Sequence, residues 1–376
     1  MSRISTKKLL ILLIGITAFT FVGYTHFQAT KGSEVISALA ILWIFVPAPT
    51  IYIISQIALR KQRRVRVIVR IYLAISFVMA ALVLGGVSWM GASDAIAAKC
   101  TAEELAEAGE IRDYPFLATR AEPVTFPSIH EYLLTGFFIS GTGGVQEQQN
   151  INEANPTVAI INGYGSCYQE ALAHGELFAK AGYSVLLFDL RFQGESGGAS
   201  VTGGYYERGD VLGAIAYLNE RTDVDPQSIG LFGLSMGGSL AILAAADVPE
   251  IKAVIAESPY KSLRAAVYES FYYFVKLPAY PFGPIAVWII ERSENARADD
   301  VVPLNEVDKI APRPILIIHG ANDRVIGAHN SQSIFDAAKH PKELWIVPDS
   351  GHSEAIVTAE KEYINRVIGF FDEHLR

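Results

Sequence analysis

The most informative part of the chain is Ser228-Ile229-Gly230-Leu231-Phe232-Gly233-Leu234-Ser235-Met236-Gly237-Gly238. Residues 228–232 are apolar enough for a buried strand, and the small apolar residues 239–246 predict a helix. A serine flanked by glycines between a strand and a helix is typical of a nucleophile elbow, because side chains at the glycine positions would collide with the neighbouring elements. The stretch therefore predicts a strained turn that presents Ser235.

A serine hydroxyl needs a base to take its proton and an acid to orient that base. On a sheet that carries such an elbow, the acid and then the histidine follow the serine along the chain. Asp323 comes directly after the strand pattern of residues 314–320, and His352 follows that of residues 343–348. Active sites of open α/β sheets lie at the carboxyl ends of the strands. We therefore predict a triad of Ser235, Asp323 and His352.

Two nearby residues offer other interpretations. Asp349 is a rival to Asp323 as the acid, although it lies on the same loop as His352. His319 closes the strand before Asp323 and is expected to pack or to bond locally. Each triad candidate alone is also compatible with an ordinary loop residue. Their joint appearance after consecutive strands favours the triad.

A negative charge that develops on a substrate oxygen requires hydrogen-bond donors. One donor is expected from the backbone N–H of Met236, which follows the nucleophile. The other is expected from the loop after the strand pattern of residues 157–161, where Tyr164 N–H is the candidate. The alternative for this loop is an ordinary glycine turn.

The segment Tyr183-Ser184-Val185-Leu186-Leu187-Phe188-Asp189-Leu190-Arg191-Phe192-Gln193-Gly194-Glu195-Ser196 matches a strand and loop usually written D-x-R-G-x-G-x-S. Together with the elbow, it makes residues 126–376 resemble the α/β-hydrolase superfamily. The branch that they resemble includes serine aminopeptidases, acylaminoacyl peptidases and lipid or thioester hydrolases. The chain departs from the pattern at Asn162, where a His-Gly pair is common, and at Phe192, where glycine is usual.

This resemblance implies an α/β fold with a mostly parallel central sheet and helices on both faces. It also implies that the aromatic-rich insertion at about residues 259–305 forms a cap. The expected reaction passes through an acyl-enzyme on Ser235. No metal or cofactor is expected, because no His or Cys cluster has ligand spacing and the glycine loops lack a phosphate-binding lysine.

The first ninety residues contain three long apolar runs. They span residues 9–27, 35–59 and 71–92, and each is long enough to cross a hydrocarbon core of about 30 Å as a helix. We predict that residues 1–92 form an anchor of three transmembrane helices and that residues 93–125 connect it to the hydrolase domain at 126–376. A cleaved signal peptide is the alternative for the first run, but no small-x-small cleavage site follows it.

Charge placement predicts an orientation for this anchor. Before Gly91 the chain has ten Lys or Arg residues and one acid, a charge of +9, whereas the remainder has 21 against 38, a charge of −17. Positively charged segments stay in the cytoplasm, so three spans place the hydrolase domain outside it. The acidic remainder excludes nucleic acid as an expected partner. The basic residues cluster before the first run and between the second and third, as Arg3, Lys7, Lys8, Arg60, Lys61, Arg63, Arg64, Arg66 and Arg70.

The chain has two cysteines, Cys100 and Cys167. Outside the cytoplasm they can form a disulfide, which would tie the connector to the loop that holds Tyr164. Two unpaired thiols are the alternative.

The sequence thus predicts a multi-pass protein of the cell membrane that hydrolyses an ester, thioester or amide bond. Its expected partners are the lipid bilayer and a small acyl, lipid or peptide substrate. A serine peptidase and an acyltransferase are alternatives within the same fold, and a non-catalytic receptor or scaffold is the alternative outside it. The oligomeric state is left open.

Overall fold

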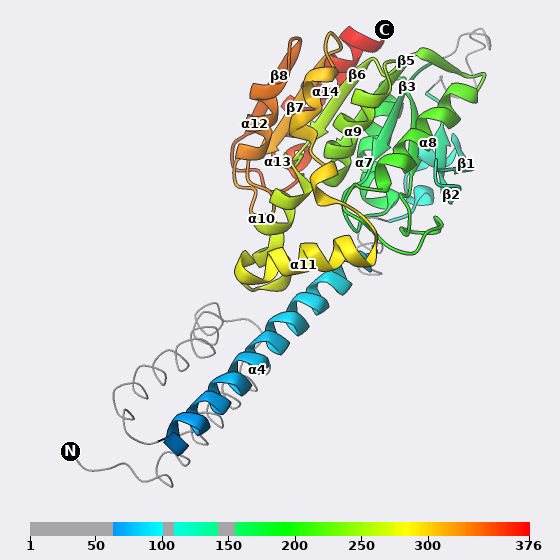
Figure 1. Ribbon diagram of the computed structural model, residues 1–376. Helices are drawn as coiled ribbons and strands as arrows, with labels where there is room; N and C mark the ends of the chain where they lie inside the picture. The colour runs from blue at the N-terminus through cyan, green and yellow to red at the C-terminus, as the bar shows by residue number, and fades with distance from the viewer. Residues whose placement is uncertain (1–62, 101–108, 142–154) are drawn as a thin grey trace. The chain divides into compact units, whose positions relative to one another are not determined.

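The computed structural model describes residues 63–100, 109–141 and 155–376, and its centre is one eight-stranded sheet (Figure 1). The strand order is β1-β2-β4-β3-β5-β6-β7-β8. β2 runs antiparallel to both of its neighbours, and every other adjacent pair is parallel. The strands are β1 (Ala121–Pro127), β2 (Leu133–Ile139), β3 (Asn155–Ile161), β4 (Ser184–Phe188), β5 (Val224–Leu234), β6 (Ala253–Glu257), β7 (Ile315–Gly320) and β8 (Lys342–Val347).

Helices cover both faces of this sheet, as the resemblance implied. Successive residues of a strand point to opposite faces. In β3, Ala159 and Ile161 belong to one apolar cluster, whereas Val158 and Ile160 belong to the other. The first cluster is completed by α8 (Glu207–Glu220), α9 (Met236–Asp247) and α12 (His329–Ala337), and the second by α7 (Leu172–Lys180) and α14 (Glu360–Leu375). The central strands are buried on both faces, which is why they are continuous apolar runs.

The remaining described α-helices are α4 (Arg63–Ile96), α6 (Pro115–Ala118), α10 (Leu263–Val275), α11 (Ala279–Ser293) and α13 (Ala355–Thr358). The two helices α10 and α11 occupy the insertion that was predicted to form a cap. The chain divides into two units, one of Met1–Gly91 with Phe271–Ala286 and the other of Ala92–Ser270 with Val287–Arg376. The second unit contains the sheet, which begins at Ala121 rather than at residue 126.

The predicted anchor falls mainly outside the described residues. The runs 9–27 and 35–59 lie there, and residues 71–92 lie within α4. In the part of the chain that the structure describes, no single helix has the combined length and hydropathy of a membrane span. The helices α10 and α11 meet this criterion only as a pair, bent by 113° at the break between them. The three spans are therefore not shown, and they stay a prediction.

Candidate active site

Ser235 lies at the sharp turn between β5 and α9. Its backbone has φ +54° and ψ −116°, a conformation that costs free energy in a residue with a side chain. A Cβ at Gly233 would lie 2.1 Å from the carbonyl oxygen of Gly237, and a Cβ at Gly237 would lie 2.0 Å from that of Ile161. Both positions must therefore be glycine, and the turn has the geometry of the predicted elbow.

His352 connects this serine to the predicted acid. Its Nε2 lies 2.8 Å from Ser235 Oγ, and its Nδ1 lies 2.6 Å from Asp323 Oδ2. Asp323 follows β7 and His352 follows β8, so adjacent parallel strands deliver both to the edge of the sheet where β5 ends. The His352 side chain is 22% exposed, whereas that of Asp323 is fully buried. A substrate can thus approach the imidazole of His352, while the carboxylate of Asp323 that orients this imidazole is shielded from solvent.

The Asp323 carboxylate is held on both oxygens. Oδ1 accepts the backbone N–H groups of Val325 at 2.8 Å and of Ile326 at 2.9 Å. Oδ2, which faces His352, also lies 3.1 Å from His319 Nε2. Burial raises the pKa of Asp323, but the hydrogen bonds from the two histidines and from the backbone outweigh it and hold this pKa well below its ordinary value. Asp323 is therefore an ionised and immobilised acid.

His319 makes contacts that the sequence analysis did not foresee. Local hydrogen bonds were expected for His319, but its contact with Asp323, the predicted acid, was not. Because Nε2 lies 2.8 Å from the carbonyl oxygen of Ile326, which can only accept, this nitrogen carries the proton and also faces Asp323. Nδ1 lies 2.6 Å from Ser331 Oγ, whose hydroxyl can donate to it. The sequence feature that could have suggested this contact is the four-residue spacing between His319 and Asp323 around a tight turn.

Asp349, the rival acid, is exposed and has a left-handed backbone with φ +59°. The hydrogen bond to His352 Nδ1 comes from Asp323 instead. The alternative assignment is therefore wrong: Asp349 supports the turn that leads to His352, and a left-handed position in a tight turn suits aspartate.

The loop after β3 lies beside the elbow. A Cβ placed on Gly163 would lie 3.5 Å from the Cβ of Ser235. Tyr164 follows in this loop, and its hydroxyl donates to the carbonyl oxygen of Ala95 at 2.5 Å. Met236 is the first residue of α9, directly after the nucleophile. The two backbone N–H groups predicted as oxyanion donors thus belong to segments that border Ser235, and their role as donors stays a prediction.

The loop after β4 is fixed by buried charges. Arg191 donates from Nη2 to Asp210 Oδ1 at 2.6 Å and from Nε to Oδ2 at 2.9 Å. Burial raises the pKa of Asp210 to about 6, and the hydrogen bonds from Arg191 oppose this rise. Glu207 is also buried and accepts from the backbone N–H groups of Thr202 and Gly204. These contacts hold the loop and leave neither acid free for a ligand.

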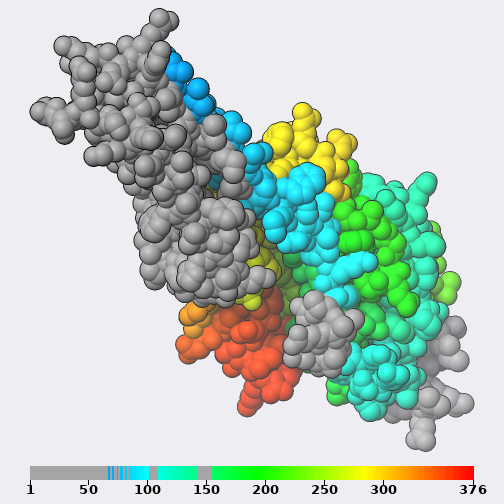
Figure 2. Space-filling view, turned by 90° about the horizontal axis from the view of Figure 1, so that it is seen from below, coloured from blue at the N-terminus to red at the C-terminus, as the bar shows by residue number. Residues whose placement is uncertain are grey.

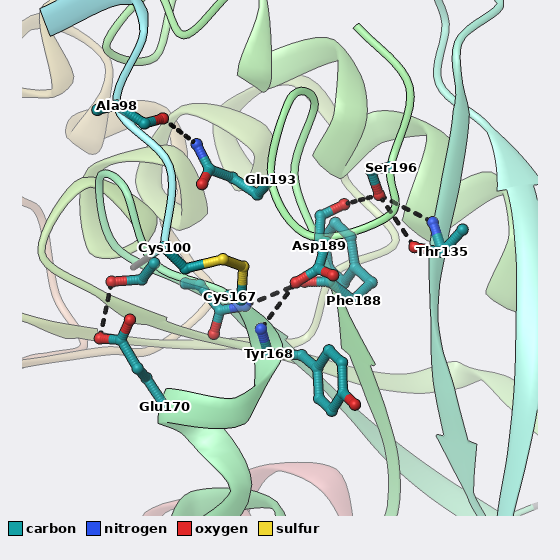
Figure 3. Close-up of a disulfide and its surroundings, with 12 residues drawn as sticks. Ala98, Cys100, Thr135, Cys167, Tyr168, Glu170, Phe188, Asp189, Gln193 and Ser196 are labelled. Atoms are coloured by element: carbon teal, nitrogen blue, oxygen red, sulfur yellow. Dashed lines mark hydrogen bonds between the residues drawn. A yellow bond between two sulfur atoms is a disulfide. The ribbon is translucent and has the colours of Figure 1, made fainter. Parts of the chain in front are cut away.

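Cys100 and Cys167 form a disulfide, with their Cα atoms 5.7 Å apart (Figure 3). Of the two alternatives that the sequence left open, the structure shows the disulfide. The bond joins the connector to the end of the loop that contains Tyr164. Among the described residues, no group of three or more His, Cys, Asp or Glu side chains is placed to hold a metal ion.

Comparisons with known proteins relate the chain to a family and to a solved fold. A model of the prolyl oligopeptidase family matches residues 171–376. The uncharacterised protein YfhR of Escherichia coli O157:H7 is 30% identical over 240 residues, which are 62% of this chain and 74% of YfhR. The uncharacterised protein YqkD of Bacillus subtilis is 27% identical over 250 residues, 65% of this chain and 77% of YqkD. The solved structure of the Pyrococcus furiosus esterase Pf2001 superposes with a TM-score of 0.56 at 26% identity, covering 71% of this chain and 97% of the esterase.

Proposed function

The chain belongs to the prolyl oligopeptidase family, and we propose that it is a membrane-anchored serine hydrolase that cleaves carboxylic esters or thioesters with an apolar acyl group. One observation carries the proposal. His352 lies within hydrogen-bond distance of both Ser235 Oγ and the buried carboxylate of Asp323. A binding module has no physical use for this relay, whereas acyl transfer requires it.

The proposed reaction begins when His352 Nε2 takes the proton of Ser235 Oγ as the hydroxyl attacks the substrate carbonyl. Asp323 holds the imidazole in the tautomer whose Nδ1 carries a proton, and it stabilises the imidazolium that forms. The N–H groups of Met236 and Tyr164 then bind the oxyanion. His352 returns the proton to the leaving group, and water releases the acyl group by the same steps in reverse.

Two arguments favour esters over peptides. A peptidase that recognises a free amine needs an available acid near the site. Of the three acids on or beside the loop after β4, Glu207 and Asp210 are held in buried hydrogen bonds to the protein, which leaves Glu195, an exposed side chain, as the one acid of the three that could bind an amine. In addition, the solved relative with 26% identity is described as an esterase. Peptide amides nevertheless pass through the same acyl-enzyme, and the family name makes them the competing substrate class.

The membrane part of the proposal rests on the sequence and is supported by the disulfide. The uncharged runs and the basic residues around them predict a cytoplasmic amino terminus. Disulfides persist outside the reducing cytoplasm, so the Cys100–Cys167 bond is consistent with an external hydrolase domain. Labelling of intact cells with a membrane-impermeant lysine reagent tests this topology. Modification of the hydrolase domain supports it, and modification only after lysis overturns it.

The substrate class is tested by comparing kcat/KM for p-nitrophenyl esters of two to twelve carbons with that for aminoacyl and N-acyl-aminoacyl p-nitroanilides. The Ser235→Ala variant is the control for background hydrolysis. We expect turnover of esters that increases with acyl length and is absent from the variant. Anilide turnover exceeding ester turnover would assign the protein to the peptidases instead.

A further inference from the structure

Residues 92–100, here called the strap, contact two loops beside the candidate active site. These are the loop that contains Tyr164 and the loop after β4. Tyr164 OH donates to the carbonyl oxygen of Ala95, and the Cys100–Cys167 disulfide joins the end of the strap to the end of the Tyr164 loop. Gln193 Nε2 donates to the carbonyl oxygen of Ala98 at 2.9 Å, which attaches the strap to the loop after β4 (Figure 3). In the space-filling view of Figure 2, cyan atoms, the colour of the strap, are seen at the surface next to green ones.

The Tyr164 loop needs such support because of its own sequence. Within Asn162-Gly163-Tyr164-Gly165-Ser166-Cys167, two glycines flank the tyrosine, and Gly165 has a left-handed backbone with φ +74°. Glycines lower the cost of alternative backbone conformations. The backbone bond from Ser166 N–H to Gly163 O is long, at 3.4 Å. The loop therefore gains little rigidity from itself.

The strap restrains this loop at two separate points. Its contact with the Tyr164 hydroxyl acts on the residue whose N–H is the proposed oxyanion donor. Its disulfide acts at Cys167, after which Tyr168 N–H donates to the buried carboxylate of Asp189 at 2.7 Å. A Cβ on Gly165 would lie 3.6 Å from the Cβ of Ala98, so the strap also packs directly against the middle of the loop. The loop is thus held between the sheet and the strap.

We propose that the strap is a positioning segment for the oxyanion hole: through the Tyr164–Ala95 hydrogen bond and the Cys100–Cys167 disulfide it holds Tyr164 N–H where the substrate oxyanion forms. This inference rests on the proposed function. Loss of one oxyanion donor lowers kcat by about 100- to 1000-fold. A donor that is displaced rather than deleted loses part of this effect, so releasing the strap lowers kcat by about 10- to 100-fold and changes KM little.

The test uses the full chain with the changes Tyr164→Phe and, separately, Cys100→Ser with Cys167→Ser. Tyr168→Phe is the matched control. It removes a hydroxyl from the same segment, but Tyr168 contacts Asp189 through its backbone N–H and Phe137 through its ring, and both contacts survive the change. The measurements are kcat and KM for an ester, the affinity for a trifluoromethyl ketone whose adduct carries an oxyanion, and the melting temperature.

We expect both test variants to lose kcat and to bind the ketone more weakly by the same factor, because the adduct and the transition state use the same donors. The control keeps wild-type kcat. Dithiothreitol, which reduces the disulfide to two thiols and becomes a cyclic disulfide itself, lowers the kcat of the wild type and leaves that of the cysteine variant unchanged.

A lower melting temperature with unchanged kcat and ketone affinity overturns the proposal, because the strap then only stabilises the fold. If the cysteine variant does not fold, Tyr164→Phe decides the question alone. Labelling of Ser235 by a fluorophosphonate distinguishes failure of the strap proposal from failure of the proposed function. A wild type that is labelled and turns over, with variants equal to it, refutes only the strap, whereas a wild type that is never labelled refutes the proposed function as well.

Discussion

Replacing Asp323 by asparagine tests the orientation of His352. Asp323 Oδ1 accepts the backbone N–H groups of Val325 and Ile326, so the amide oxygen of an asparagine must occupy that position. Its NH2 group then occupies the position of Oδ2, where it faces His352 Nδ1 and His319 Nε2. An NH2 group cannot accept a hydrogen bond. The proton of His352 is therefore driven to Nε2, and the imidazole can no longer take the proton of Ser235.

The expected loss follows from this change of tautomer. In the serine protease triad the equivalent change lowers kcat by about 10⁴-fold, which corresponds to about 5 kcal/mol of transition-state free energy. Asp323→Asn is therefore expected to lower kcat for an ester by about 10³- to 10⁴-fold with little effect on KM. The assay is steady-state ester hydrolysis at pH 8, and Asp349→Asn is the control because Asp349 is an exposed aspartate in the same loop as His352, whose Nδ1 bonds to Asp323 instead. A loss of less than tenfold for Asp323→Asn, or a larger loss for Asp349→Asn, would refute the reasoning.

Three further predictions concern buried polar groups. His319→Leu lowers kcat by about tenfold to hundredfold, because a hydrogen bond to a charged group contributes about 1.5–3 kcal/mol; a kcat within twofold of wild type in ester hydrolysis contradicts this. Asp210→Ala leaves the buried Arg191 guanidinium unpaired and costs about 3–5 kcal/mol in urea unfolding, whereas the combined change Arg191→Met with Asp210→Leu costs less; equal costs contradict this. Burial raises the pKa of Asp189 to about 7 from an ordinary 3.8, so the folded state binds a proton that the unfolded state releases, and stability falls as pH rises from about 4 to 7. Asp189→Asn keeps the acceptor for Tyr168 N–H but has one acceptor oxygen fewer for the backbone N–H of Glu195, so the test is the pH dependence: the stability of the variant relative to wild type is expected to rise between pH 5 and pH 8, by at most about 3 kcal/mol; a difference that is independent of pH contradicts this.

The central strands and the three predicted triad residues were accessible from sequence for one physical reason. Parallel strands buried on both faces must be continuous apolar runs, so their ends are visible, and polar residues directly after them fall at one edge of the sheet. The first strand was harder to place. β1 is an edge strand that exposes alternate residues and contains Pro123 and Pro127, so its pattern resembles a loop, and the sheet begins at Ala121 rather than at residue 126.

Contacts between residues that are distant in sequence, or that depend on side-chain direction, could not be predicted in the same way. Cys100 and Cys167 are 67 residues apart, and composition alone leaves their pairing open. The role of His319 depends on the turn after β7 bringing its Nε2 back to Asp323, which spacing suggests but does not determine. The link from Tyr164 to Ala95 likewise joins a loop of the sheet to the connector.

The central claim is that Ser235 is a nucleophile activated by His352. The most direct measurement is mass spectrometry of peptides from the full-length protein after reaction with a fluorophosphonate, compared with the His352→Ala and Ser235→Ala variants. The account predicts a phosphonyl adduct on the peptide that contains Ser235, formed much more slowly in His352→Ala and absent in Ser235→Ala. A folded wild type that carries no adduct, or an adduct on another serine, would contradict it.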